Sequence, residues 1–306
     1  MTSATSADPT LSRRPEAIRA VAVRHPGRWV AGAVVLLVAA MMVNSALTNK
    51  RFGWGEQAKY AFSAQILDGV RITLVLTFAS MLIGVLLGVV LAVMRLSPNP
   101  LVSRAAWLYI WVFRGTPVLV QLIIWANLGA LFPQLSIGIP FGPAFAQGET
   151  SRIVPMLVAV LLGLGLNEGA YMAEIVRAGI LSVDEGQTEA AAALGMSRMA
   201  TLRRIVLPQA MRVIVPPTGN ETISMLKTTS LAAYVPFYEL LFKTQNIYTR
   251  TYEVMPMLIM ASLWYLAMTS VLMVGQYYIE RHYARGATRN LPDTPLQKLR
   301  QRMARA

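Results

Sequence analysis

Long apolar runs, separated by short polar breaks, constrain this chain more than any other feature. Hydrophobic residues make up 55% of the 306 residues and charged residues only 14%, whereas soluble domains carry about a quarter charged residues. A helix of about 20 apolar residues crosses the ~30 Å hydrocarbon core of a bilayer. The sequence therefore predicts an all-α integral membrane protein with six transmembrane helices. The six apolar runs cover residues 29–47, 65–94, 105–132, 153–178, 208–228 and 254–279.

The two ends of the chain differ from this apolar middle. Residues 1–27 are rich in Ser, Thr, Ala, Pro and Arg, and we expect a disordered cytoplasmic tail there because such a segment cannot bury a core. The apolar run within residues 28–48 is long enough to span a bilayer and has no evident small-residue cleavage site, which favours a retained helix over a signal peptide. Residues 281–306 form a second, basic tail.

Basic residues indicate which side of the membrane each polar segment faces. The net charge is +13, and most Lys and Arg residues lie in the two tails and in the segments at 95–104 and 179–212. Because basic residues accumulate on the cytoplasmic side, these segments and both termini are expected there. The outer loop at 133–152 is rich in Pro and Gly and is expected to be irregular.

The residue inventory excludes several kinds of chemistry. The chain contains no cysteine, so disulfides, thiol catalysis and Cys-based metal sites are excluded. Its two histidines, His25 and His282, stand alone near the termini. No metal site and no catalytic residue is predicted. No Gly-x-x-x-x-Gly-Lys-Ser/Thr phosphate loop occurs either, so ATP hydrolysis would have to come from a partner.

A polar, alanine-rich segment at 182–208 interrupts the apolar runs. Helix propensity is high from Glu189 to Leu194, Gly195 is suited to end that helix, and a basic and apolar run begins after Ser197. This pattern predicts a short helix, a turn and a second helix. Small alanine side chains let another protein approach closely, which indicates a docking element.

This segment resembles the cytoplasmic signature of the permeases of binding-protein-dependent ATP-binding-cassette (ABC) importers. The signature is Glu-Ala-Ala, three residues, Gly, nine residues and Ile-x-Leu-Pro, and every position is matched here. In that family the segment forms the coupling helix that sits in a groove of the ATPase subunit. The resemblance assigns ATPase coupling to Glu189, Ala190, Ala191, Gly195, Ile205, Leu207 and Pro208.

A second motif is similar to the polar amino acid branch of these permeases, the histidine, glutamine and arginine type. FRGTPVLVQL at 113–122 matches that branch's RGTP-x-x-x-Q-L pattern, and similarity covers most of residues 65–280. The branch commonly has Lys-Asp-Thr-Ser-Leu where this chain has KTTSL at 227–231, which puts any carboxylate role there in doubt. The resemblance implies a five-helix type I importer permease core at 60–280, preceded by an extra N-terminal helix.

Polar residues inside the predicted spans mark a candidate substrate pathway. Gly115 and Pro117 predict a break or kink, which either lines a pathway or is a packing feature without ligand contact. Glu168 and Glu221 lie deep in their spans, where charge is costly; they either line a site that favours a cationic side chain or pair with Lys227 or backbone groups. The candidate pathway residues are Arg114, Gly115, Thr116, Pro117, Gln121, Asn167, Glu168, Asn220, Glu221 and Lys227.

A further acidic residue, Glu174, lies three positions before Arg177 on the same predicted helix. This spacing brings the two side chains together, and it predicts an ordinary ion pair.

By resemblance, the chain is a permease subunit that moves a polar amino acid across the bacterial inner membrane by alternating access. The expected partners are an ATPase subunit that binds ATP and Mg, an extracytoplasmic amino-acid-binding protein, a second permease copy or paralogue, and the lipid bilayer. No cofactor on this chain and no nucleic acid are expected. One alternative is an ion-gradient-driven amino acid transporter that uses Glu168 and Glu221; it leaves the segment from Glu189 to Pro208 unexplained. Another is a membrane-anchored protein whose basic tails bind nucleic acid or lipid.

Overall fold

The computed structural model describes residues 26–139 and 142–283. The chain divides into two units, Met1–Lys50 and Arg51–Ala306, which are treated separately. Most of both predicted tails, with His25, lies outside the described residues.

The first unit contains one long helix, α1 (Pro26–Thr48). It is apolar on every face, almost all of its side chains are exposed, and it is long and apolar enough to cross a membrane. A helix without a polar face is suited to lipid on all sides. A helix thus covers the predicted segment at 28–48, and its crossing of the membrane remains a prediction.

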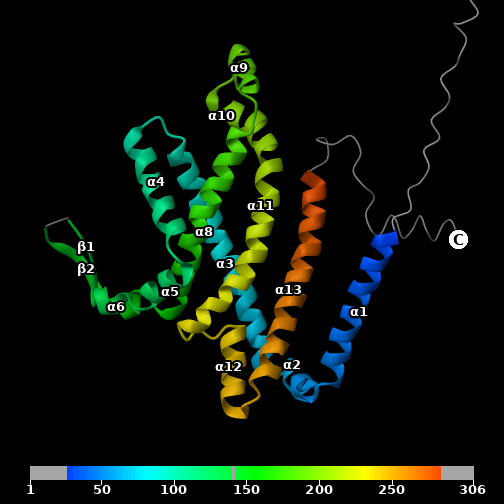
Figure 1. Cartoon of the computed structure of the whole chain (residues 1–306). Coiled ribbons are helices and arrows are strands. Elements are labelled where there is room, and N and C mark those ends of the chain that lie inside the picture. Colours follow the sequence, from blue (N-terminus) through cyan, green and yellow to red (C-terminus); the bar gives the residue numbers. More distant parts are fainter. Residues whose placement is uncertain (1–25, 140–141, 284–306) are drawn as a thin grey trace, which may run out of the picture. The chain divides into compact units, whose positions relative to one another are not determined.

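The second unit is a helical bundle with a small sheet (Figure 1). After the short η2 (Lys50–Phe52), its elements are α2 (Trp54–Ala61), α3 (Ala64–Arg95), α4 (Pro100–Gly115), α5 (Val118–Ala126), α6 (Leu128–Leu131), β1 (Gln134–Gly138), β2 (Ala144–Glu149), α7 (Thr150–Ile153), α8 (Met156–Leu181), α9 (Glu185–Ala193), α10 (Arg198–Thr201), η3 (Leu202–Val206), α11 (Leu207–Thr228), η4 (Thr229–Tyr234), α12 (Leu240–Thr251) and α13 (Val254–Tyr283).

Four helices of the described chain, α1, α3, α8 and α13, are long and apolar enough to cross a membrane. The bent pair α4–α5 makes a fifth candidate if it counts as one span. Helix α11 occupies the predicted span at 208–228, but it is not among these candidates. Its polar side chains, which include Arg212, Asn220 and Glu221, lower its hydropathy. The six-span count thus remains a prediction.

Glycines let α3 and α8 approach closely. Gly84 and Gly88 on α3 face Glu168 and Met172 on α8, and a Cβ added at Gly88 would lie 2.9 Å from the backbone nitrogen of Ala173. In the reverse direction, Gly165 and Gly169 face Ile83 and Leu87. This small-xxx-small spacing on both helices permits backbone contact where lipid gives little hydrophobic drive for association.

A buried polar network joins the N-terminal half of α3 to α12 and α13. The side chain of Glu239 is fully buried; it caps α12 by accepting from the Phe242 N–H (2.7 Å) and also accepts from Tyr265 Oη (2.7 Å). The Leu240 N–H donates to Thr73 Oγ1 (3.1 Å). Burial raises the pKa of Glu239, and the hydrogen bonds it accepts oppose that rise.

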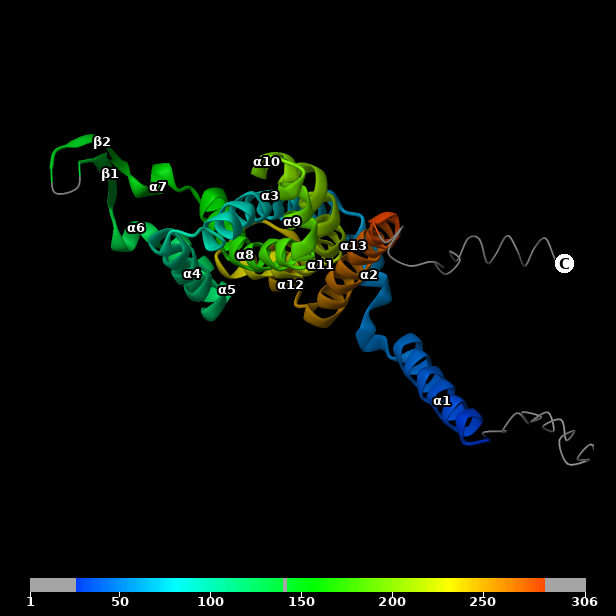
Figure 2. The same cartoon turned by 90° about the horizontal axis from the view of Figure 1, so that it is seen from above.

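The loop at 133–152 corrects one sequence prediction. Residues 133–152 were expected to be irregular, yet β1 and β2 form an antiparallel hairpin followed directly by α7. The Gly and Pro residues of this loop suggested irregular backbone, yet Gly138 and Gly148 lie within the strands, which are only five and six residues long. The hairpin projects from the bundle in both views (Figures 1 and 2).

The predicted ion pair between Glu174 and Arg177 is confirmed, with Oε2 and Nη2 2.7 Å apart on α8.

The glycine crossing gives a stability prediction. Gly88→Ala should lower the midpoint of thermal unfolding in detergent by the equivalent of about 1–3 kcal/mol, because the new methyl group overlaps the α8 backbone. Gly275→Ala is the matched control on α13, since a Cβ there meets no atom within 4 Å. Equal effects of the two substitutions would show that the crossing is not tightly packed.

Candidate functional site: a polar cavity at a helix break

The predicted break at Gly115 and Pro117 is present and sharp. Helix α4 ends at Gly115, Thr116 is extended (φ −114°, ψ 144°), and α5 starts after Pro117 at an angle of 100° to α4. Proline cannot donate a backbone hydrogen bond and disfavours helical geometry in the residue before it. The sequence Thr116-Pro117 therefore stops α4 where it does.

Side-chain amides satisfy the carbonyl groups that this break leaves without helical partners. Gln121 Nε2 donates to the carbonyl oxygens of Phe113 (3.0 Å) and Thr116 (3.1 Å), and to Thr116 Oγ1 (2.7 Å). Asn167 Nδ2 on α8 donates to the same Phe113 oxygen (2.8 Å) and to Gln121 Oε1 (3.3 Å). Because one donor comes from α8, these bonds also hold the break against that helix.

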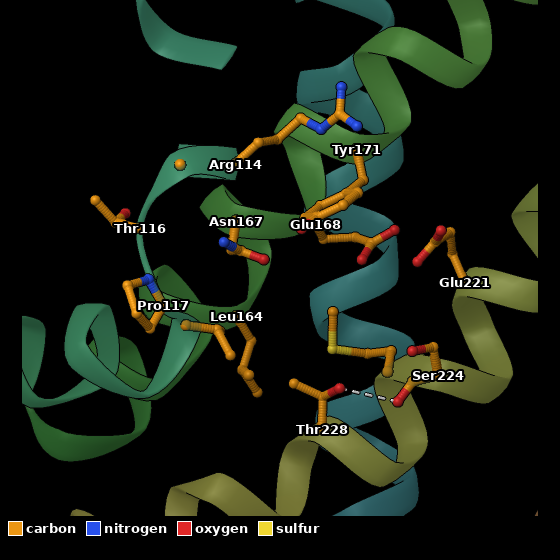
Figure 3. Close-up of a pocket in the computed structure, with 13 residues that line it drawn as sticks. Arg114, Thr116, Pro117, Leu164, Asn167, Glu168, Tyr171, Glu221, Ser224 and Thr228 are labelled. Carbon is orange, nitrogen blue, oxygen red and sulfur yellow. Dashed lines mark hydrogen bonds between the residues drawn. The ribbon is translucent and has the colours of Figure 1, made fainter. Parts of the chain in front are cut away.

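The break borders a cavity of about 560 Å³ between α4–α5, α8 and α11. Figure 3 shows Arg114 and Tyr171 at one end, Ser224 and Thr228 at the other, and Glu168 and Glu221 between them. The lining residues are Arg114, Gly115, Thr116, Pro117, Val118, Leu164, Asn167, Glu168, Tyr171, Glu221, Ser224, Met225 and Thr228.

Most of the predicted pathway residues line this cavity, and three do not. Gln121 instead lies at the helix break, where its amide donates to the carbonyl oxygens of Phe113 and Thr116. Asn220 and Lys227 line a separate hollow of about 490 Å³ between α11 and α13. There the Asn220 Oδ1 accepts from Gln276 Nε2 (3.0 Å), which also donates to Glu280 (2.6 Å).

Sequence reasoning missed several lining residues, although helical spacing pointed to them. Tyr171 follows Glu168 by three residues on α8, and Ser224 and Thr228 follow Glu221 by three and seven residues on α11. Residues at these spacings share one face of a helix. Once one carboxylate of each helix faces the cavity, these neighbours do so as well.

The two carboxylates point toward each other across the cavity (Figure 3). Glu168 is only 4% exposed, and its Oε1 has no hydrogen-bond partner in the described part of the chain. Neither carboxylate forms an ion pair with Lys227 among the described residues. A buried polar atom without a partner is unusual in a folded protein and indicates a site for an ion, water or ligand.

At the end of the cavity, the guanidinium of Arg114 lies over the ring of Tyr171, with Cζ 5.1 Å from the ring centroid. A cation over an aromatic face is held by the ring quadrupole, which leaves the in-plane N–H groups able to donate elsewhere. The cavity therefore combines two carboxylates, one guanidinium and several neutral polar groups.

The segment at 182–208, which we call the coupling segment after the signature that it matches, has the predicted helix, turn and helix. Asp184 caps α9 by accepting from the Gly186 N–H (2.8 Å), and Gly195 takes a left-handed conformation (φ 74°). Ser197 then caps α10 by accepting from the Ala200 N–H (3.3 Å). Of the signature residues, Ala191 is buried, whereas Glu189, Ala190, Gly195, Leu207 and Pro208 are exposed and Ile205 is partly exposed.

The fold and the cavity define a multi-pass helical membrane protein with a polar compartment bordered by spans. The chain belongs to the family of binding-protein-dependent transport system inner membrane components, whose family model matches residues 84–285. The predicted family and its permease fold are confirmed.

Three relatives illustrate the likeness. The arginine transport system permease protein ArgU of Corynebacterium glutamicum is 49% identical, covering 94% of this chain and 89% of ArgU. The histidine/lysine/arginine/ornithine transport system permease protein HisM of Salmonella typhimurium is 37% identical, over 67% of this chain and 83% of HisM. The crystal structure of an amino acid ABC transporter with histidines is 34% identical, with a TM-score of 0.62 over 74% of this chain and 97% of that chain. The ArgU match covers 288 of the 306 residues, so it includes at least part of the 23-residue helix α1.

The hydrogen bonds at the break predict the effect of removing the Gln121 amide. Gln121→Leu should lower unfolding stability in detergent by about 1–3 kcal/mol, because buried carbonyl oxygens lose a donor. Asn127→Leu is the control, since this amide donates to the Ile123 carbonyl (2.8 Å) at an exposed helix end. A loss for Gln121→Leu no larger than for Asn127→Leu would contradict the role given to Gln121.

Proposed function

We propose that this chain is the permease subunit of an ATP-driven importer and that its substrate, a polar amino acid, passes through the cavity at the helix break. The observation that carries the proposal is the pair of opposed carboxylates, Glu168 and Glu221, inside a membrane-embedded cavity. Intramembrane carboxylates are costly and usually functional. The mechanism is alternating access, in which the cavity opens in turn to the two sides of the membrane.

The lining favours an amino acid with a cationic side chain. Two carboxylates suit a guanidinium or ammonium group, and the guanidinium of Arg114 at the cavity end suits the α-carboxylate. The amide of Asn167 and the hydroxyls of Ser224 and Thr228 add neutral hydrogen-bonding groups. The names of ArgU and HisM, which include arginine, support this substrate class.

The energy comes from a separate ATPase subunit that binds ATP and Mg and docks on the coupling segment. The exposed Glu189, Ala190 and Gly195 are available for such contact, and the chain has no phosphate loop of its own. An amino-acid-binding protein delivers substrate on the opposite side, and a second permease copy or paralogue completes the pair. The location is the bacterial inner membrane, with both termini in the cytoplasm.

The coupling role is tested by placing a charge at Gly195. ATP-dependent uptake into vesicles that hold all subunits should fall about tenfold or more with Gly195→Asp, because a charge without a partner is costly in a protein interface. Gly195→Asn is the matched control: it has nearly the same shape, Asn and Asp both tolerate the left-handed conformation, and the Cβ enters open space. Normal uptake by Gly195→Asp, at normal membrane levels, would exclude Gly195 from the docking of the ATPase subunit.

The substrate role is tested by neutralising the carboxylates one at a time. Glu168→Gln and Glu221→Gln should each lower uptake of L-arginine relative to L-glutamine about tenfold, since a hydrogen bond between charged groups is lost. Glu253→Gln, at an exposed position before α13, is the control. An unchanged ranking of the two amino acids in both variants would exclude these carboxylates from substrate selection.

The same vesicles separate this function from an ion-gradient-driven transporter. Uptake should stop when the ATPase subunit is disabled and continue when the proton gradient is collapsed. The opposite pattern would assign Glu168 and Glu221 to ion coupling.

A further inference from the structure

A second cleft lies next to the cavity, on the side toward the coupling segment. It has a volume of about 520 Å³ and lies between α4, α8 and the last residue of α3. Its characteristic side chains are three arginines and three aromatic residues: Arg95, Arg114, Arg177, Trp107, Trp111 and Tyr171.

The cleft and the cavity are continuous along two helices. Both are lined by Arg114, Gly115 and Tyr171. On α8, the cavity stripe of Leu164, Asn167, Glu168 and Tyr171 continues with Glu174 and Arg177 at the same helical spacing. The stack of Arg114 on Tyr171, at one end of the cavity in Figure 3, consists of two residues that line both spaces.

The sign of the charge reverses between the two spaces. The cavity holds two carboxylates and Arg114, whereas the cleft holds three guanidinium groups and one carboxylate, Glu174. Arg177 is paired with Glu174, and Arg95 donates to Ser103 Oγ (2.9 Å). Arg114 has no hydrogen bond or ion pair within the described residues, so its N–H groups remain available.

The aromatic wall of the cleft adds a second kind of contact. Trp107 and Trp111 lie one turn apart on α4, with ring centroids 6.1 Å apart and planes inclined by 13°. A flat indole surface of this kind holds a planar or cationic side chain. Guanidinium groups bind carboxylates through paired hydrogen bonds. The cleft thus offers places for both ends of a cationic amino acid.

We propose that this cleft is a second substrate site, which binds the α-carboxylate of the amino acid after it has left the cavity toward the coupling segment. The inference rests on the proposed transport function and adds a site and a direction to it. The Arg114–Tyr171 stack separates the two sites, and its opening lets the substrate pass from one to the other.

The absence of cysteine from the chain allows a direct test. A single cysteine, Trp107→Cys, is placed in the cleft, where Trp111 remains as the indole surface. Its reaction rate with an uncharged maleimide is measured in the complete complex in nanodiscs. L-arginine should slow the reaction, whereas agmatine, which lacks the carboxylate, should not. In the same background, Glu174→Gln with Arg177→Gln removes the ion pair without leaving a lone charge. Arg177 uses Nε and Nη2 in its bonds to Glu174, which leaves Nη1 to donate to the substrate carboxylate beside Arg114. Its loss should therefore raise the L-arginine concentration for half protection about tenfold.

The control is a second i,i+3 ion pair outside the cleft, Glu149 and Arg152, with Oε2 and Nε 2.8 Å apart. Glu149→Gln with Arg152→Gln should leave the protection unchanged. Equal protection by agmatine, or none by L-arginine, would overturn the carboxylate site. Labelling that depends on phosphatidylglycerol in the nanodisc and not on L-arginine would overturn it in favour of an anionic lipid headgroup. ATP-dependent uptake of L-arginine by the unsubstituted complex is measured in parallel: its absence counts against the proposed function, and its presence without protection counts against the second site alone.

Discussion

Inside a bilayer, every backbone polar group has to be satisfied by the protein itself or by water in a cavity. The break at Thr116 and Pro117 meets this constraint with the amides of Gln121 and Asn167. Because these donors come from α5 and α8, the repair of the break also fixes the angle of α5 and its contact with α8. The sharp turn between α4 and α5 then borders a polar space beside α8 and α11. The amides that satisfy the helix break therefore also hold two of the helices that border the cavity.

The close crossing of α3 and α8 determines where the buried carboxylate lies. The stem of Glu168 packs on Gly84, and no larger residue at position 84 leaves room for it. One face of α8 contacts α3 through Gly165 and Gly169, and the adjacent face, with Leu164, Asn167 and Tyr171, borders the cavity. Glu168 stands between these faces, so its carbon atoms are packed while its carboxylate reaches the cavity. A glycine on another helix is therefore part of the polar site.

Features that depend on neighbouring residues could be predicted from the sequence. The helix and turn of the coupling segment, the break at Pro117 and the Glu174–Arg177 pair are of this kind. The rotation of a helix about its axis is different, because distant packing sets it. Asn220 and Glu221 are adjacent, so they point about 100° apart on α11, and only Glu221 faces the cavity. The hairpin was missed because short strands leave little periodicity among turn residues.

The two carboxylates meet because their helices leave the same segment at matched distances. Glu168 precedes the end of α8 at Leu181 by 13 residues, and Glu221 follows the start of α11 at Leu207 by 14 residues. At 1.5 Å per residue, both lie about 20 Å from the coupling segment. Each is joined to it by continuous helix. Under the proposed function an ATPase docks on α9 and α10, and this continuity offers a route by which a tilt of those helices would change the angle between α8 and α11 and the separation of the carboxylates. The π-helical turn η3 at the start of α11 is a natural place for that angle to change, because such turns interrupt the regular hydrogen-bond ladder.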